Sequence, residues 1–175
     1  MPGKTRDVRP AWLWAGWLTA VTVLVTGYFR LPLDRLGPDR PTLSWTVFIT
    51  LLAGLALLLL RQIRAVLLDR RDARPGLVIP FLMSLSVLVF SGGYHALARA
   101  PGEFVGLETR LDALYFTVVT LATVGYGDIT PQGQTARLVT IVQILYSFVF
   151  LTAGATAFSR RVRGVLAHHL GRDGL

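Results

Sequence analysis

Residues 123–128 read Thr-Val-Gly-Tyr-Gly-Asp, and this stretch decides the interpretation of the chain. Gly125 and Gly127 tolerate positive φ angles, which a row of carbonyls facing one way demands. A cation that sheds its water in a narrow pore needs such oxygens, and the Thr123 hydroxyl can add one. The alternative is an ordinary glycine-containing turn. The predicted ion-binding residues are Thr123, Val124, Gly125, Tyr126 and Gly127, the first four through their carbonyls.

The composition is that of a membrane protein. Of 175 residues, 53% are hydrophobic and 16% are charged, against about 25% charged in a typical globular chain. The mean hydropathy is +0.54. The absence of cysteine excludes disulfides and thiolate metal sites. The net charge of +8 does not indicate a nucleic-acid partner, because no soluble domain is left to carry a basic face.

Four apolar stretches without Arg, Lys, Asp or Glu predict membrane-spanning helices. They are residues 11–29, 43–60, 77–97 and 138–158. The first has 19 residues and reaches about 28 Å as a helix, enough for the hydrocarbon core. A cleavable signal peptide is the alternative for this stretch. A retained helix is preferred, because the stretch is longer than usual and no clear A-x-A site follows.

A fifth apolar segment, residues 111–122, is too short to cross a membrane. Its 12 residues reach only about 18 Å as a helix. A short helix followed by a glycine-bearing segment predicts a re-entrant pore loop, which is tolerated at membrane depth only inside protein. Thr109 is the expected N-cap, with Asp112 as its reciprocal partner. The helix dipole favours a cation at the carboxyl end, where the filter begins.

The distribution of charge predicts the orientation in the plasma membrane. With the N-terminus in the cytoplasm, the cytoplasmic segments are 1–10, 61–76 and 159–175. They hold 12 basic and 4 acidic residues, against 6 of each in the outer segments. The positive-inside rule therefore favours two cytoplasmic termini and a filter near the outer face. The basic segments are expected to contact anionic lipid headgroups.

From residue 111 to about residue 163 the chain resembles the pore module of tetrameric potassium channels, most specifically at 123–128. The resemblance implies an all-α membrane protein with four transmembrane helices. The re-entrant pore helix and the filter lie between the third and fourth. Segment 77–97 becomes the outer helix, 111–122 the pore helix and 138–158 the inner helix. One filter motif per chain predicts a homotetramer around one pore. Val124 and Tyr126 are expected to pack behind the filter.

The surroundings of the filter differ from the family pattern. The family often has a tryptophan-containing aromatic pair in the pore helix, where this chain has the pair Tyr115-Phe116. The Tyr115 hydroxyl can still reach Asp128. Some bacterial members carry a glutamate behind the filter, where this chain has Val119. Thr120 lies where the family often has Thr or Ser. The residues predicted to support the filter are Asp128, Tyr115, Val119 and Thr120.

An apolar stripe on the inner helix has two interpretations that remain open. It lines the cavity and gate, or it only packs against the outer helix. Its members, at i, i+4, i+7 and i+11, are Ile144, Phe148, Leu151 and Ala155. The usual glycine hinge of the family falls at Ser147, and the nearest glycine is Gly154. Both are hinge candidates.

The expected function is a channel that conducts potassium passively, with the ion as permeant ligand and no cofactor. No catalytic constellation is present, so an enzyme is not expected. None of the four stretches carries arginine at every third position, which disfavours classical voltage sensing. A regulatory domain, if one exists, is expected on a separate subunit. The alternatives are the membrane subunit of a potassium uptake system with a cytoplasmic regulator, disfavoured by the single filter motif, and a non-conducting membrane adaptor, disfavoured by the intact glycines.

Overall fold

The computed structural model describes residues 11–30, 41–67 and 75–170. Their helices are α1 (Ala11–Arg30), α2 (Pro41–Leu67), α3 (Pro75–Ala98), α4 (Arg110–Leu121) and α5 (Gln134–Leu170). The predicted cytoplasmic segment 1–10 lies outside the described residues, as do 68–74 of the basic loop and 171–175 of the tail.

Two short strands interrupt the helices, β1 (Phe104–Val105) and β2 (Thr130–Pro131). They pair antiparallel, with Phe104 opposite Pro131 and Val105 opposite Thr130. The all-α prediction did not include this ribbon, because two-residue strands leave no periodic pattern in a sequence. The ribbon joins the chain before α4 to the chain after the predicted filter.

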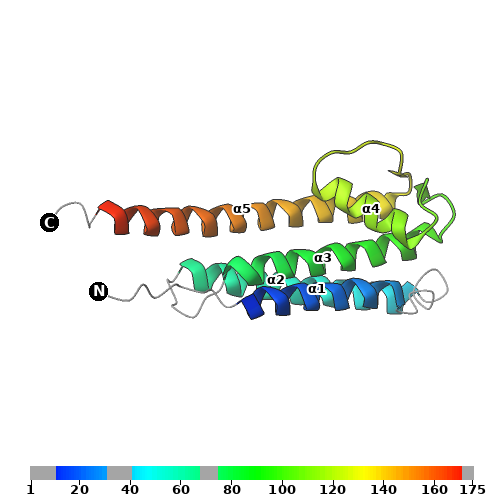
Figure 1. Ribbon diagram of the computed structural model, residues 1–175. Coiled ribbons are helices and arrows are strands. Elements are labelled where there is room, and N and C mark those ends of the chain that lie inside the picture. Colours follow the sequence, from blue (N-terminus) through cyan, green and yellow to red (C-terminus); the bar gives the residue numbers. More distant parts are fainter. Residues whose placement is uncertain (1–10, 31–40, 68–74, 171–175) are drawn as a thin grey trace.

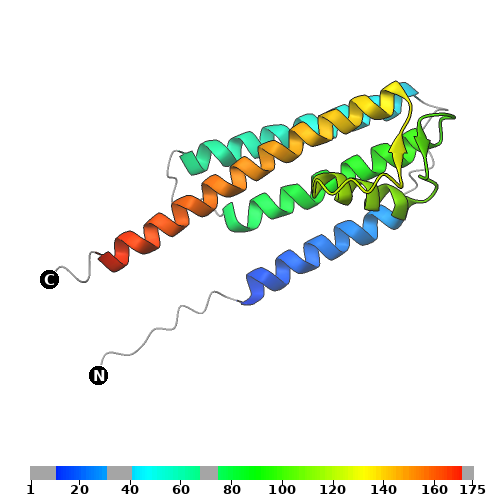
Figure 2. The same ribbon diagram turned by 90° about the horizontal axis from the view of Figure 1, so that it is seen from above.

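Helix α3 is the centre of the bundle and packs against each of the other four helices. Helices α1 and α2 lie on either side of it (Figure 2). The four long helices run roughly along one axis, and the short helix α4 lies at one end beside α3 and α5 (Figure 1). Helix α1 begins, and α5 ends, toward the opposite end of the bundle (Figure 1).

Three helices in the described part of the chain are long and apolar enough to cross a membrane. They are Pro41–Ala65, Leu77–Ala98 and Gln134–Thr152. The remaining long helix, α1, has 20 residues and occupies the stretch expected at 11–29. The helix expected at 43–60 continues to Leu67.

Helix α5 extends well past the inner helix expected at 138–158. Its 37 residues span about 55 Å, more than the roughly 30 Å of a hydrocarbon core. Hydropathy indicates where a helix leaves the hydrocarbon core of the membrane, whereas the last residue of the helix depends on capping and helix-breaking residues. Residues 159–170, expected as part of a short tail, therefore continue the helix.

An aromatic cluster fixes α4 against α3. The ring of Tyr94 meets Phe116 edge-on, with centroids 5.0 Å apart and planes at 81°. Phe104, from β1, meets both rings at 5.6 and 5.5 Å. Such edge-to-face pairs add stabilisation beyond the area that they bury. The packing sets the position of the short helix whose end carries the predicted filter.

Candidate functional site

Helix α4 begins with a capping box, as the sequence predicts. The Thr109 hydroxyl accepts a hydrogen bond from the Asp112 backbone N–H at 3.1 Å. In return, the Asp112 carboxylate accepts from the Thr109 N–H at 2.7 Å. The bonds from the backbone and side chain of Thr109 hold the pKa of Asp112 below its ordinary value. The start of the helix is therefore fixed, and its carboxyl end leads directly into residue 123.

The backbone of the predicted filter has positive φ at alternate residues. The angles are +56° at Thr123, +59° at Gly125 and +81° at Gly127. The prediction for the two glycines is confirmed. Reversing the sign of φ at every second residue cancels the usual alternation of carbonyl directions along an extended chain, so successive carbonyls can share one side. This is the arrangement that a row of oxygen ligands requires.

The positive φ of Thr123 was not predicted, because a β-branched residue is strongly disfavoured there. Two backbone hydrogen bonds hold the turn in which it lies. The N–H of Thr123 donates to the Thr120 carbonyl at 3.1 Å, and that of Val124 donates to Val119 at 3.0 Å. Val119 and Thr120, expected as filter supports, thus contact the filter through their carbonyls.

The Tyr115 hydroxyl lies near Asp128, at the far end of the predicted filter. The side chain of Asp128 raises the pKa of this hydroxyl, chiefly through hydrogen bonding, because the nearby carboxylate favours the protonated form. The proximity is consistent with the prediction that Tyr115 can reach Asp128. This proximity brings the second turn of α4 close to the residue that follows the glycines.

Gly106 is a filter-flanking residue that the sequence analysis missed. Its φ is +82°, and a Cβ there would lie 2.6 Å from the backbone oxygen of Asp128. The chain that leads into α4 passes directly against the end of the filter, and only glycine fits this approach. A lone glycine in a loop gave no signal, because the neighbour that makes it necessary is 22 positions away.

A buried polar network holds α4 between α3 and α5. The Tyr94 hydroxyl donates to Gln143 Oε1 at 2.7 Å, and Gln143 Nε2 donates to the Thr117 carbonyl at 2.8 Å. The exposed fractions of the three residues are 0%, 2% and 0%. A polar residue inside an apolar stretch is costly unless bonded. Gln143, the one amide in 138–158, was a signal available in the sequence.

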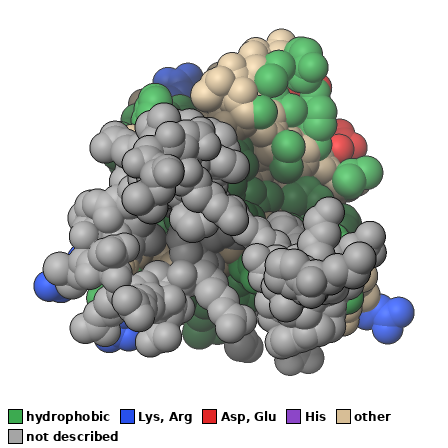
Figure 3. Space-filling model, turned by 60° about the vertical axis from the view of Figure 1, so that its left-hand side comes forward, with side chains coloured by type: hydrophobic (Ala, Val, Ile, Leu, Met, Phe, Trp, Pro, Cys, Tyr) green, Lys and Arg blue, Asp and Glu red, His purple; other side chains and the backbone are tan. Residues whose placement is uncertain are grey.

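The residues of the predicted filter are exposed in the single chain. The exposed fraction is 51% for Val124 and 71% for Tyr126, so neither packs behind the filter within one chain. Large apolar side chains of α4 and α5 are exposed as well. They are Leu111, Val118, Leu138, Ile141, Leu145 and Phe148. In Figure 3, hydrophobic side chains show among other atoms toward the upper right, and charged side chains lie at the outline.

Within the single chain, the apolar stripe of α5 does not pack against the outer helix α3. Its four members, Ile144, Phe148, Leu151 and Ala155, are all exposed. The buried side of the same helix carries Gln143, Ser147 and Phe150 instead. The Ser147 hydroxyl donates to the Gln143 carbonyl at 2.9 Å. Helix α5 continues without a break through Ser147 and Gly154, the two hinge candidates.

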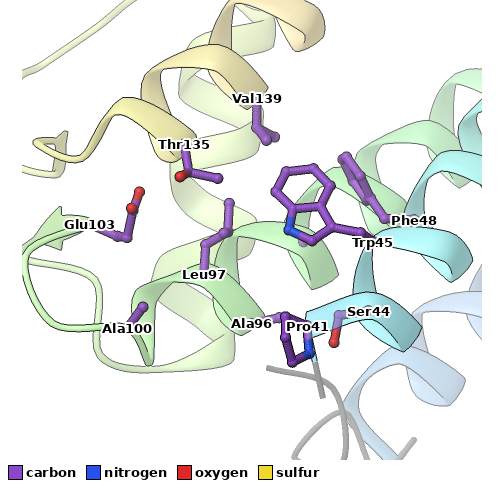
Figure 4. Close-up of a pocket in the computed structure, with 11 residues that line it drawn as sticks. Pro41, Ser44, Trp45, Phe48, Ala96, Leu97, Ala100, Glu103, Thr135 and Val139 are labelled. Carbon is purple, nitrogen blue, oxygen red and sulfur yellow. The ribbon is translucent and has the colours of Figure 1, made fainter. Parts of the chain in front are cut away.

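A pocket of about 200 Å³ lies between α2, α3 and α5, apart from the predicted filter (Figure 4). Trp45 and Phe48 supply aromatic walls, and Glu103 and Thr135 supply polar atoms. The Glu103 carboxylate accepts the Ala136 N–H at 2.8 Å and so stabilises the start of α5. No filter residue lines this pocket.

Comparison with known proteins shows similarity to ion channels. Residues 82–164, which are 83 of the 175, match the family model described as "Ion channel". This segment is slightly less than half of the chain, and it contains α4 and the predicted filter. Members of this family are channels rather than enzymes. With its long apolar helices, this ion-channel chain is a multi-pass membrane protein.

Several curated relatives are potassium channels by name. The chain is 33% identical to the voltage-gated potassium channel Kch of Escherichia coli over 125 residues, 71% of this chain and 29% of that protein. It is 42% identical to the two-pore potassium channel 4 of Arabidopsis thaliana over 77 residues, 43% and 26% of the two chains. The inward rectifier potassium channel Kirbac3.1 of Paramagnetospirillum magnetotacticum is 33% identical over 147 residues, which are 78% of this chain and 40% of that protein.

This ion-channel chain thus spans 26 to 40% of the length of these three relatives. No solved structure matches it.

Proposed function

We propose that the chain forms a potassium-selective channel that conducts K⁺ passively across the plasma membrane. The observation that carries this proposal is the alternation of positive φ at Thr123, Gly125 and Gly127, directly after a capped helix. This geometry lets successive carbonyls replace the water of a permeating ion. The family match and the names of the relatives support potassium as that ion.

The ion ligands are backbone oxygens and one hydroxyl. The carbonyls of Thr123, Val124, Gly125 and Tyr126 bind the ion, and Gly127 completes the filter. The carboxyl end of α4 adds a partial negative charge at the beginning of this row. Asp128, near Tyr115, lies at the other end, where its charge attracts cations.

The pore is proposed to form between four identical chains. One chain has one filter segment and therefore one wall of a pore. The exposed side chains of Val124, Tyr126 and the apolar residues of α4 and α5 are the surfaces that neighbouring chains would cover. The exposed stripe from Ile144 to Ala155 then lines the cavity below the filter.

The proposed topology has four transmembrane helices, α1, α2, α3 and α5, with α4 as a re-entrant pore helix. Both termini lie in the cytoplasm, because this arrangement places most basic residues there. The basic ends of α2 and α5 then contact anionic lipid headgroups. The pore module comprises residues 77–158, close to the segment that matches the family.

Current recorded under bi-ionic potassium and sodium conditions, from the purified full chain in planar bilayers, tests the proposal. We expect a reversal potential that shows strong preference for potassium. Gly125→Ala should abolish selective current, because φ at this position is +59°. Gly102→Ala is the matched control, since Gly102 has a φ of +80° but lies outside the filter.

Three outcomes contradict the proposal. Equal permeability to potassium and sodium would show that the pore does not select for potassium. Flux only in the presence of an added cytoplasmic protein indicates the membrane subunit of an uptake system. Silence of the wild-type chain at verified tetramer assembly indicates a non-conducting adaptor.

A further inference from the structure

The last turn of α1 is bonded to the first residue of α4. One guanidinium nitrogen of Arg110, Nη1, donates to the carbonyl of Phe29 at 2.9 Å and to that of Tyr28 at 3.3 Å. In the reverse direction, the Tyr28 hydroxyl donates to the Arg110 carbonyl at 3.0 Å. The Ser91 hydroxyl of α3 donates to the same Tyr28 hydroxyl at 2.7 Å. We call these four bonds the α1 clamp.

The chemistry of both helix ends favours the α1 clamp. The last carbonyls of α1 have no partner within their own helix, and they carry the negative end of its dipole. The Arg110 guanidinium satisfies two of them. The exposed fraction is 4% for Tyr28 and 0% for Ser91, so water does not compete for their hydroxyls. A bond lost here leaves a buried polar group without a partner.

The clamp joins a helix outside the ion-channel match to the pore helix inside it. The matched segment begins at residue 82, whereas Tyr28 and Phe29 lie more than 50 positions earlier. Arg110 precedes Thr123 by 13 positions, and α4 runs without a break from Arg110 to Leu121, two positions before Thr123. A displacement of Arg110 therefore moves the carboxyl end of α4, where the filter begins.

We propose that Tyr28 and Arg110 are positioning residues, through which α1 holds the pore helix in the place that keeps the filter conductive. The inference rests on the proposed channel function and assigns a role to the N-terminal helix. The α1 clamp lengthens the time for which the filter stays conductive. It leaves selectivity unchanged, because it does not contact the ion ligands.

The test uses potassium current through the full chain during sustained activity, at several external potassium concentrations. Tyr28→Phe removes the bonds of the hydroxyl, and Arg110→Gln removes the guanidinium. Each removes two bonds and should accelerate the decay of current at least about fivefold, the factor by which loss of one ordinary hydrogen bond changes an equilibrium. Higher external potassium should slow the decay, since bound ions stabilise the filter. The reversal potential should stay that of the wild type.

Two further variants separate positioning from general loss of structure. Arg110→Lys keeps a positive charge near the carbonyls and should restore part of the wild-type decay time. Thr22→Ala is the matched control on α1, because the Thr22 hydroxyl is exposed and donates only to Leu18 of its own helix, at 2.8 Å. It should leave the decay unchanged.

Hydrogen exchange of the α4 amides gives a readout that does not depend on conduction. Tyr28→Phe should accelerate exchange in residues 113–124, and Thr22→Ala should not. Wild-type decay and wild-type exchange in both Tyr28→Phe and Arg110→Gln would overturn the inference. If the wild-type chain itself carries no current, the proposed function is wrong, and the exchange rates alone decide whether α1 positions the pore helix.

Discussion

The substitution Gln143→Met tests whether the buried network holds α4 in place. Methionine keeps the unbranched shape of glutamine and removes both of its side-chain hydrogen bonds. The Tyr94 hydroxyl and the Thr117 carbonyl then lose partners at 2.7 and 2.8 Å. Neither residue is exposed, so water cannot replace the amide without a rearrangement of the helices.

The expected loss of unfolding free energy is about 1 to 3 kcal/mol per chain. Hydrogen bonds between membrane helices average about 0.6 kcal/mol, with the strongest near 1.7, and two of them are removed. The burial of both partners places the value in the upper part of this range. The apolar contacts of the side chain change little, because its volume is nearly conserved.

Equilibrium unfolding in mixed detergent micelles, followed by circular dichroism, measures this loss. Gln134→Met is the matched control, because Gln134 is exposed at the first position of α5. The double variant with Tyr94→Phe should cost less than the sum of the two single variants, since both remove the same bond. A change below about 0.3 kcal/mol, or full additivity, would refute the network as a source of stability.

Three further predictions concern the flanks of the filter. Gly106→Ala should lower the free energy of unfolding by about 2 to 5 kcal/mol in thermal unfolding, and Gly102→Ala should lower it by about 1 to 2 kcal/mol. The difference arises because only the Cβ at position 106 clashes with Asp128, whereas both substitutions strain a backbone with positive φ. Asp128→Asn should lower the titration midpoint of Tyr115 toward the ordinary value of 10.0, measured by ultraviolet difference spectra; an unchanged midpoint means that no bond exists. The same bond contributes stability below pH 10 and loses it as the pH rises through the raised pKa. Thr109→Ala should cost about 1 kcal/mol by removing the cap of α4, and calorimetry showing no loss would contradict this.

The features that the sequence predicts well are those that local patterns determine. The apolar stretches predicted the helices, and the spacing of Thr109 and Asp112 predicted the cap of α4. Both predictions succeed because each feature depends on residues within a few positions of one another. The glycines at 125 and 127 gave the filter backbone for the same reason.

Other features depend on contacts between distant positions. The positive φ of Thr123 is imposed by its place at the end of α4, and the approach of Gly106 to Asp128 needs the ribbon. The packing of α1 beside α3 and α4 could not be predicted either, because Tyr28 meets Ser91 across 63 positions and Arg110 across 82. An apolar helix looks the same in sequence whichever neighbour it packs against.

The ribbon of β1 and β2 closes residues 106–129 into a loop whose two ends meet. The Glu103 carbonyl strengthens this closure by accepting the N–H groups of Gln132 and Gly133 at 2.9 and 3.1 Å. Because Phe104 pairs with Pro131, the ends of the ribbon that lead to α3 and α5 lie side by side. A pull that separates α3 from α5 along the chain must therefore open these pairs before it stretches residues 106–129, which include the predicted filter.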